Sequence, residues 1–411
     1  ISIYSLTNPN LRSFCLSLYV RAGSIFEDLS NNGISHLFEH VVFRNIKNKY
    51  ENFYELLAMH GLCFQGSTYK KFVSFTIDGP QHEFDFAIEI LCGLFDEIKL
   101  TSHDFNNEKG RIKAEIREKD RRSSLDFYFD SIVWKNSEVE KIVLGYCKTI
   151  DRVSVKKINE FRQKVLSAGN CFVYATGNIS DENLDALNKK ISELDISQSN
   201  PGFTNTVTVN NEFFHREKKI WIKNNYWHYI QIGFDVDCSK YPGGVYDLLY
   251  ALLFNGDKAL VYNYLSEDNP IIYSYDSTFE QYDNVGNINF SFEVDRNKIE
   301  DVFKTVVELL NAAKDGRFNF EANLNYEMFN WELDLDNPDN LNWNMAYYNH
   351  ILKTQPIDYS DEFYGRFRVT KEQIIDAAKY IFRRCNMTVA VKGDRKKINA
   401  EAIEKILESL D

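Results

Sequence analysis

Two histidines and a glutamate stand within five residues of one another, at His36, Glu39 and His40. On a helix, side chains at i and i+4 lie on one face about a turn apart, so both imidazoles could bind one metal ion. Imidazole nitrogen suits zinc, and a glutamate beside the second histidine could take a proton from an activated water. The order H-x-x-E-H, the inversion of the H-E-x-x-H zinc motif, therefore predicts a hydrolytic metal centre. The alternative is an ordinary surface or packed histidine pair.

A catalytic zinc site needs a third protein ligand and leaves its fourth position to water. Glu108 and Glu115 are seven residues apart in the sequence, which is about two helical turns. Both carboxylates would therefore share one face of the helix expected to begin near residue 104. In so charged a helix, a solvated acidic face is the competing interpretation.

These residues belong to a chain whose two halves look alike. At an offset of 216 residues, apolar, asparagine and glycine positions recur, and the matched pairs include Val153 with Val369, Asn170 with Asn386 and Gly177 with Gly393. Each copy reads as a helix, a short apolar strand, a glycine turn and a second amphipathic helix. The recurrence predicts one α+β unit used twice. A chance match between two helix–strand–helix patterns is the alternative.

The periodicity of apolar residues predicts the neighbouring elements. Strands are expected at residues 13–20, 71–77, 229–236 and 287–294, and helices at 32–44, 52–60, 82–98, 104–123, 246–265 and 298–314. Because these elements come in blocks without strict βαβ alternation, the fold class is α+β with a largely antiparallel sheet in each half. The polar stretch 196–210 is expected to link a first domain, 1–195, to a second, 211–411.

The composition is that of a globular protein, with 44% hydrophobic and 26% charged residues among 411. The 48 lysines and arginines against 60 aspartates and glutamates give a net charge of −12, which disfavours nucleic acid as a partner. Seven cysteines without a C-x-x-C spacing suggest reduced thiols and a cytoplasmic location. No transmembrane segment is expected, because the nearest candidate, the apolar stretch 86–95, is interrupted by Glu89. No signal peptide is expected, because the sequence starts without a basic segment or a long apolar run.

The chain resembles the pitrilysin or insulinase family of zinc peptidases, the M16 inverzincins. The family signature Gly-x-x-His-x-x-Glu-His, followed by two apolar residues and Phe, is matched at 33–43, and its later Glu-x6-Glu pair is matched at 108–115. The resemblance implies one Zn²⁺ per chain, held by His36, His40 and Glu115. It implies a catalytic role for Glu39 and an orienting role for Glu108. It also implies two homologous domains of the LuxS and mitochondrial-processing-peptidase type of metallohydrolase fold.

The family's substrate-binding edge strand resembles the segment Phe64, Gln65, Gly66, Ser67 and Thr68. Two departures from the family pattern lie in or near this region. Many members carry Gly-Thr after the signature Phe, where this chain has Arg44-Asn45, and the usual Asn-Ala of the edge strand is Gln65-Gly66. An unusual substrate preference is therefore expected.

A larger departure lies in the second half. The family's Arg-Glu-Lys-x-Gly-Leu-x-Tyr-Ser stretch, whose Arg and Tyr close on the substrate, corresponds here to residues 266–274. Tyr273 is present, but the Arg has become Ser266. As an alternative, Tyr273 is a packed aromatic in a strand. Family members of this size act as two-chain assemblies, so a second M16-like subunit is expected to supply the Arg/Tyr pair.

Together these features predict a zinc-dependent endopeptidase for unfolded peptides, the catalytic subunit of a heterodimeric processing protease. Removal of a leader from a small bacterial peptide and general degradation of short peptides are both open as its task. Two alternatives belong to other functional classes: a non-catalytic M16-like scaffold, and a subunit that grips peptides without cutting them.

Overall fold

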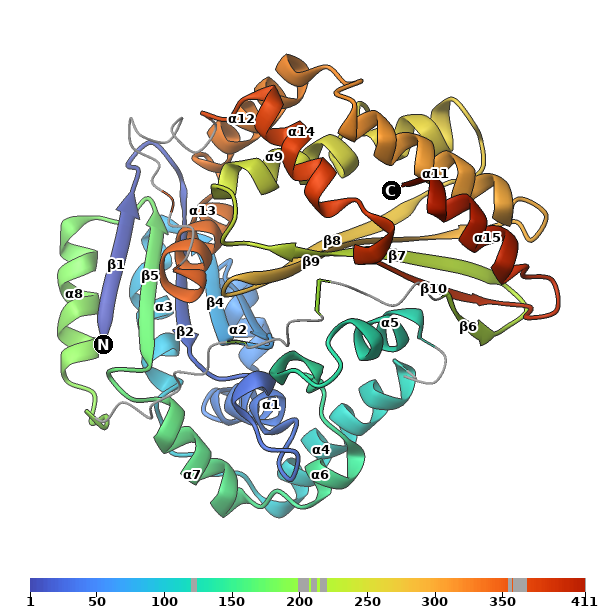
Figure 1. Cartoon of the computed structure of the whole chain (residues 1–411). Helices are drawn as coiled ribbons and strands as arrows, with labels where there is room; N and C mark the ends of the chain where they lie inside the picture. The colour runs from blue at the N-terminus through green and yellow to red at the C-terminus, as the bar shows by residue number, and fades with distance from the viewer. Residues whose placement is uncertain are drawn as a thin grey trace. The chain divides into compact units, whose positions relative to one another are not determined.

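The structure is a computed structural model, and it describes residues 1–119, 124–198, 207, 213–214, 220–353, 357 and 368–410. The chain is divided into two compact units. Unit 1 comprises Ile1–Asp120, Glu138–Thr206 and Glu332–Ile351, and unit 2 comprises Arg121–Ser137, Val207–Trp331 and Leu352–Asp411. Each unit contains one five-stranded sheet with helices packed on it (Figure 1).

The sheet of unit 1 has the strand order β1-β5-β2-β4-β3. Its strands are β1 (Ser2–Thr7), β2 (Ser13–Val20), β3 (Cys63–Thr68), β4 (Val73–Pro80) and β5 (Cys171–Gly177). β1 runs parallel to β5, and the other neighbours are antiparallel. β2 spans the predicted residues, and alternate side chains such as Leu16 and Leu18 enter the hydrophobic core.

The helices of unit 1 are α1 (Ile34–Lys47), α2 (Phe53–Met59), α3 (Phe84–Gly93), α4 (Ser102–Glu118), α6 (Cys147–Asp151), α7 (Val155–Val165), α8 (Asp181–Ser192) and α13 (Pro338–Ala346). The core of the unit lies between one face of the sheet and the helices other than α13, and α1 contributes Leu37, Phe38 and Val41 to it. These three are spaced as one face of a helix, so the opposite side of α1 can carry polar groups.

Unit 2 repeats the topology with the strand order β6-β10-β7-β9-β8. Its strands are β6 (Ile220–Asn224), β7 (His228–Asp237), β8 (Tyr275–Tyr282), β9 (Val285–Val294) and β10 (Met387–Gly393). Its helices include α5 (Leu125–Val133), α9 (Gly243–Phe254), α10 (Leu260–Tyr262), α11 (Ile299–Lys314), most of α12 (Phe320–Asp334), α14 (Lys371–Ile381) and α15 (Ala400–Leu407). Again one pair, β6 and β10, is parallel. The predicted fold class is confirmed.

The recurrence at an offset of 216 corresponds to real elements. α7 and α14 coincide at that offset to the residue, and so do β5 and β10. The second amphipathic helix of each copy is α8 in unit 1 and α15 in unit 2. One supersecondary unit has therefore been used twice.

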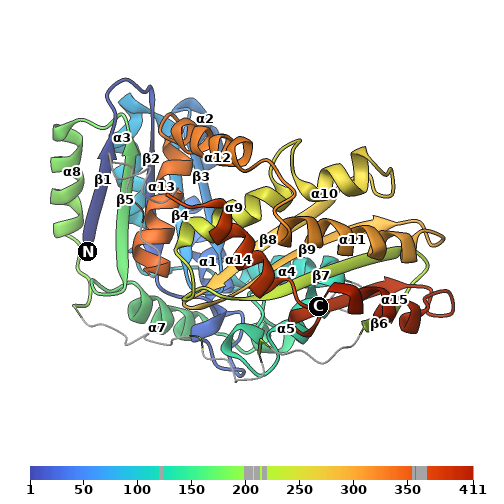
Figure 2. The ribbon, with the colours of Figure 1, turned by 45° about the horizontal axis from the view of Figure 1, so that its top comes forward.

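Two helices pack on the sheet of the other half of the sequence. α13 packs on β2 and β5, and Figures 1 and 2 both show it beside these strands of the first half. In the same way α5 packs on β10 and β7 in unit 2. The single boundary expected at 196–210 does not anticipate this exchange, and most of that segment lies outside the described residues.

One predicted helix is interrupted. The pattern predicts a continuous helix at 246–265, whereas α9 ends at Phe254. Asn255 is extended and Gly256 has φ 71°, a left-handed conformation that ends the helix, and a short α10 follows. The helix predicted at 104–123 ends at Glu118 as α4, and residues 120–123 of that prediction lie outside the described part.

A membrane-spanning helix has to be both long and apolar. None of the described helices is long and apolar enough to cross a bilayer.

Candidate active site

The helix that carries the motif is fixed at its first turn by a buried carboxylate. Glu27 accepts hydrogen bonds from the backbone N–H groups of Gly33 (2.7 Å) and Ser35 (2.8 Å). The side chain of Asn32 donates a third, at 2.8 Å. A carboxylate suits the positive end of a helix dipole, so Glu27 stabilises the start of α1. This contact was not predicted from the sequence, although an acidic residue shortly before a helix is a recognisable signal.

Gly33 makes the close turn into α1 possible. Its φ is 96°, a conformation that other residues rarely adopt. A Cβ at this position would lie 2.7 Å from Cα of Gly145. The first residue of the motif is therefore glycine for steric reasons.

The three residues predicted to hold a metal ion lie together. His36 and His40 on α1 and Glu115 on α4 each offer a ligand atom within 4.8 Å of the other two. Nε2 of His36 is 3.6 Å from Oε2 of Glu115, too long for a hydrogen bond. Two ligands bound at about 2 Å to a tetrahedral zinc ion lie roughly 3.3 Å apart. The separation of this one pair is close to that value.

The electrostatics of His36 also suit a metal. Burial lowers the pKa of His36 to about 3, with His40 and Lys119 adding to the effect, so the imidazole is neutral at pH 7. A metal-binding histidine must be neutral. Nδ1 of His36 is buried and has no hydrogen-bond partner among the described residues. No hydrogen bond at this nitrogen therefore holds the ring away from a metal ion. The residue set fits zinc.

Glu39, predicted to act in catalysis, contacts the edge of the sheet. The hydroxyl of Thr68 on β3 donates to its Oε2 at 2.7 Å. A Cβ on Gly66 would lie 2.9 Å from Oε1, so the absence of a side chain there leaves room for that oxygen. Burial raises the pKa of Glu39, Thr68 and His40 lower it, and Glu115 raises it further. The sequence placed Gly66 and Thr68 in a substrate strand and did not show that they contact Glu39.

Glu108 is the most buried carboxylate of the site, with its side chain 3% exposed. Its Oε2 is 3.6 Å from Nδ1 of His40, and Arg44 and Arg111 approach it at 3.7 and 3.6 Å. Arg44 also pairs with Asp104 at 2.9 Å. A carboxylate beside the second nitrogen of an imidazole can fix the orientation of the ring. Arg44, noted in the sequence only as a departure from the family pattern, compensates the buried charge.

Within the described part of the chain, β3 stands at one end of the strand order, beside β4, and is therefore an edge strand. The predicted substrate-binding residues on β3 lie beside α1, which carries Glu39 and the two histidines. The side chain of Phe64 is buried and stacks on Phe43 at 4.5 Å, so only its backbone is available to a ligand. Gln65 is exposed, and Ser67 is half-buried.

Tyr273 belongs to unit 2, like Ser266. It precedes β8 and is 96% exposed. The alternative that Tyr273 is a packed strand aromatic is therefore wrong. The packed tyrosine of this region is Tyr275, whose hydroxyl donates to the carbonyl of Phe254 at 2.8 Å.

A second group of metal-binding side-chain types lies on the other face of the sheet of unit 1. Cys15 on β2 and Asp78 on β4 are cross-strand partners, and Cys15 donates to Asp339 of α13 at 3.7 Å. Burial raises the pKa of Asp78 to about 6, although Cys15 lowers it. Sequence spacing could not indicate this group, because α13 comes from the other half of the chain.

Fold and geometry together define a class of protein. This chain consists of two copies of one α+β unit, and the first copy carries an H-x-x-E-H sequence beside an edge strand. The model of insulinase, peptidase family M16, matches residues 3–145, and the model of the peptidase M16 inactive domain matches residues 152–322. The chain belongs to the M16 family.

Relatives share this assignment at low identity. The protein is 21% identical over 315 residues to the zinc protease YmxG of Bacillus subtilis, described as uncharacterized, and the match covers 75% of each chain. It is 23% identical over 180 residues to the beta subunit of mitochondrial-processing peptidase of Saccharomyces cerevisiae. That match covers 43% of this chain and 39% of the yeast subunit, so less than half of that relative is spanned.

Solved structures agree on the fold. A protease from Helicobacter pylori has a TM-score of 0.81 at 17% identity, and the match covers 95% of this chain and 96% of that chain. The first half of the periplasmic protease PqqL from Escherichia coli has a TM-score of 0.75 at 15% identity, with 99% and 93% covered.

Proposed function

We propose that the protein is a zinc-dependent endopeptidase that cleaves unfolded peptides. The observation that carries this proposal is the convergence of His36, His40 and Glu115 beside the carboxylate of Glu39. One Zn²⁺ per chain would occupy that set. When bound, zinc supplies a Lewis acid that polarises the scissile carbonyl and activates a water molecule.

Glu39 would move the proton. Thr68 holds Oε2, so Oε1 is the atom placed to accept a proton from water and to return it to the leaving amine. The raised pKa of Glu39 brings the carboxyl closer to the pH at which the enzyme would work, which favours transfer in both directions. Gly66 keeps Oε1 unobstructed.

Glu108 would orient the site without touching the substrate. Its negative charge, 3.6 Å from Nδ1 of His40, would favour a proton on that nitrogen and leave the other ring nitrogen for the ion. Arg44 and Arg111 reduce the cost of its buried charge.

The substrate would add a strand to the edge of β3. Backbone hydrogen bonds to an edge strand need an extended peptide, and therefore an unfolded one. The exposed side chain of Gln65 would contact the residues of that peptide, while Phe64 would offer only its backbone. Tyr273, which is exposed in unit 2, would be a further contact to the substrate.

A second M16-like subunit would complete the active site. Ser266 stands where the family carries an Arg that closes on the substrate, so the partner would provide an Arg/Tyr pair. The yeast relative is itself named as one subunit of a peptidase. Equal cleavage rates with and without the candidate partner would contradict this part of the proposal. A cytoplasmic location and leader removal stay predictions.

The substitution Glu39→Gln tests the catalytic proposal. We expect zinc content to remain at one per chain and cleavage of unfolded peptides to fall by about 10²- to 10⁴-fold, the usual range for an acid–base group. Glu89→Gln, an exposed carboxylate on α3, is the matched control. A wild-type chain that binds no zinc would support the scaffold alternative. Zinc binding without any product would support the peptide-gripping one.

A further inference from the structure

A hollow of about 270 Å³ opens beside the proposed catalytic residues. It is large enough for one or two side chains and has three cationic groups in its lining, Arg44, Lys47 and Arg111. Glu39 and Glu108 are the carboxylates in the same lining. Counted by formal charge, the side chains of this hollow carry an excess of one positive charge, before any metal ion is added.

The three cations are not equally available to a ligand. Arg44 is paired with Asp104 and lies near Glu108, and Arg111 shares Glu108. Lys47, by contrast, forms no ion pair with any carboxylate in the part of the chain that the structure describes. The positive charge available to an anionic ligand in this hollow is therefore that of Lys47.

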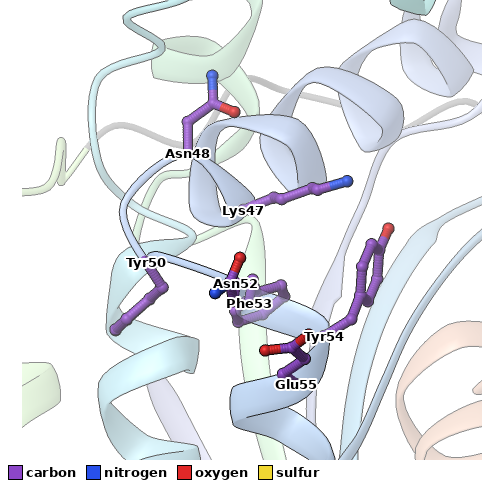
Figure 3. A pocket seen from close by; sticks show the side chains of 7 residues that line it. All are labelled: Lys47, Asn48, Tyr50, Asn52, Phe53, Tyr54 and Glu55. Carbon is purple, nitrogen blue, oxygen red and sulfur yellow. The ribbon is translucent and has the colours of Figure 1, made fainter.

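Lys47 is held in place by an aromatic ring. Its Nζ lies 4.5 Å from the centre of the Tyr54 ring, a cation–π arrangement. Both residues also line a second, larger hollow of about 620 Å³. Figure 3 shows Lys47 from α1 and Tyr54 from α2 reaching to one side of that hollow, with Tyr50 on the other. Lys47 thus stands at the boundary between the two hollows.

The position of Lys47 along α1 relates it to the scissile bond. Glu39, Phe43 and Lys47 follow one another at four-residue intervals, so they share one side of the helix. The rise from Glu39 to Lys47 is about 12 Å, which equals roughly four residues of an extended peptide. A side chain held at Lys47 would therefore come from a residue within about four positions of the bond that is cut.

We propose that Lys47 binds a carboxylate of the substrate within about four residues of the scissile bond, so that the preferred peptides are acidic near the cleavage site. This inference rests on the proposed peptidase function. The aromatic rings of Phe43 and Tyr54 would contact the apolar part of the acidic residue, while the ammonium meets its charge. The carboxylate could belong to a Glu or Asp side chain or to the carboxyl end of a short peptide.

A binding experiment tests this without hydrolysis. The zinc-loaded chain with Glu39→Gln is titrated at low salt with fluorescent unfolded peptides that differ only by Glu or Gln, placed at successive positions. Each peptide is made with a free and with an amidated carboxyl end, which separates the two sources of carboxylate. We expect about fivefold tighter binding of the carboxylate form at one or two positions, as for an exposed ion pair of about 1 kcal/mol.

The preference should depend on Lys47 alone. Adding Lys47→Gln should bring the ratio close to one, whereas Lys49→Gln, which removes an exposed lysine paired with Asp96, should leave it unchanged. Equal binding of Glu and Gln peptides at every position, no binding of either, or a preference that survives Lys47→Gln would each overturn the inference. A chain that cleaves peptides without regard to charge fails only this inference, whereas a chain without zinc fails the proposed function.

Discussion

The helix that follows the central strand differs between the two copies of the fold in its burial and its polar residues. α9 of unit 2 is buried at ten of its 12 residues, and Asp247 is its only charged residue. α1 of unit 1 is buried at eight of its 14, and its partly exposed side carries Glu39 and His40. The helix at this place in the fold is thus almost wholly buried in unit 2. In unit 1 one side of it is polar and faces α4 and β3.

The two units also differ in the helix that brings a carboxylate to α1 or to the end of α9, which is α4 in unit 1 and α12 in unit 2. In unit 1, α4 presents Glu108 and Glu115 to the histidines of α1. In unit 2, Glu327 of α12 accepts a hydrogen bond at 3.0 Å from Asn255, just after α9. Both helices carry a buried or partly buried carboxylate, but only in unit 1 does one lie next to imidazoles.

Replacing one glutamate in each unit by glutamine should give the largest contrast, which is a contrast in zinc affinity. Glu115→Gln removes one of three proposed ligands, so we expect zinc affinity to fall by more than about 100-fold, beyond the usual cost of losing an outer partner. Glu327→Gln should leave zinc content unchanged. Metal analysis after dialysis against a weak chelator measures both. Zinc loss in the Glu327 variant would show that the copies are not separate in function.

Filling the space beside Glu39 with a methyl group should have a smaller effect, on the rate of peptide cleavage. Gly66→Ala would push on Oε1 of Glu39, because the new Cβ would lie 2.9 Å away, and displacement of a catalytic group by about 1 Å can cost 10²-fold. We expect kcat for peptide cleavage to fall by about 10- to 100-fold with zinc retained.

Gly110→Ala on α4 is the control for this change. A Cβ there meets nothing within 4 Å, so activity should persist and stability should rise by about 1 kcal/mol through helix propensity. Unchanged activity in Gly66→Ala would mean that Oε1 is not the atom that accepts the proton.

The sequence predicted those parts of the molecule that depend on local spacing. Periodicity was enough to place His36, Glu39 and His40 on one helix, and Glu108 and Glu115 on one face of another. It did not bring the two helices together, because a solvated acidic face was the competing interpretation; that step rested on the family resemblance. The exchange of α5 and α13 could not be predicted, because it depends on packing between segments far apart in the sequence. The same holds for Thr68 and Lys47, whose contacts are set by a neighbouring strand and helix.

The sheet faces under α5 and α13 each carry an aspartate, and the two aspartates differ in their hydrogen-bond donors. In unit 2, Asn287 donates to Asp235 at 3.0 Å. In unit 1, Oδ1 of Asp78 is buried and has no hydrogen-bond donor among the described residues. Asp78 as a whole is half-buried, but a carboxylate oxygen removed from water without a donor is costly when the group is ionised. This cost is the main reason for the raised pKa of Asp78, and the nearby Asp339 raises it further.

Asp78→Asn should therefore stabilise the protein at neutral pH. Because the folded-state pKa of about 6 lies above the ordinary 3.8, the folded state binds more protons between these values, and stability falls as pH rises through this window. We expect the variant to exceed the wild type by about 1 to 2 kcal/mol in free energy of unfolding at pH 7.5, and to match it at pH 4. Urea unfolding at both pH values measures this, with the exposed Asp185→Asn as control. An equal gain at both pH values would place the effect in packing against α13, not in the charge of Asp78.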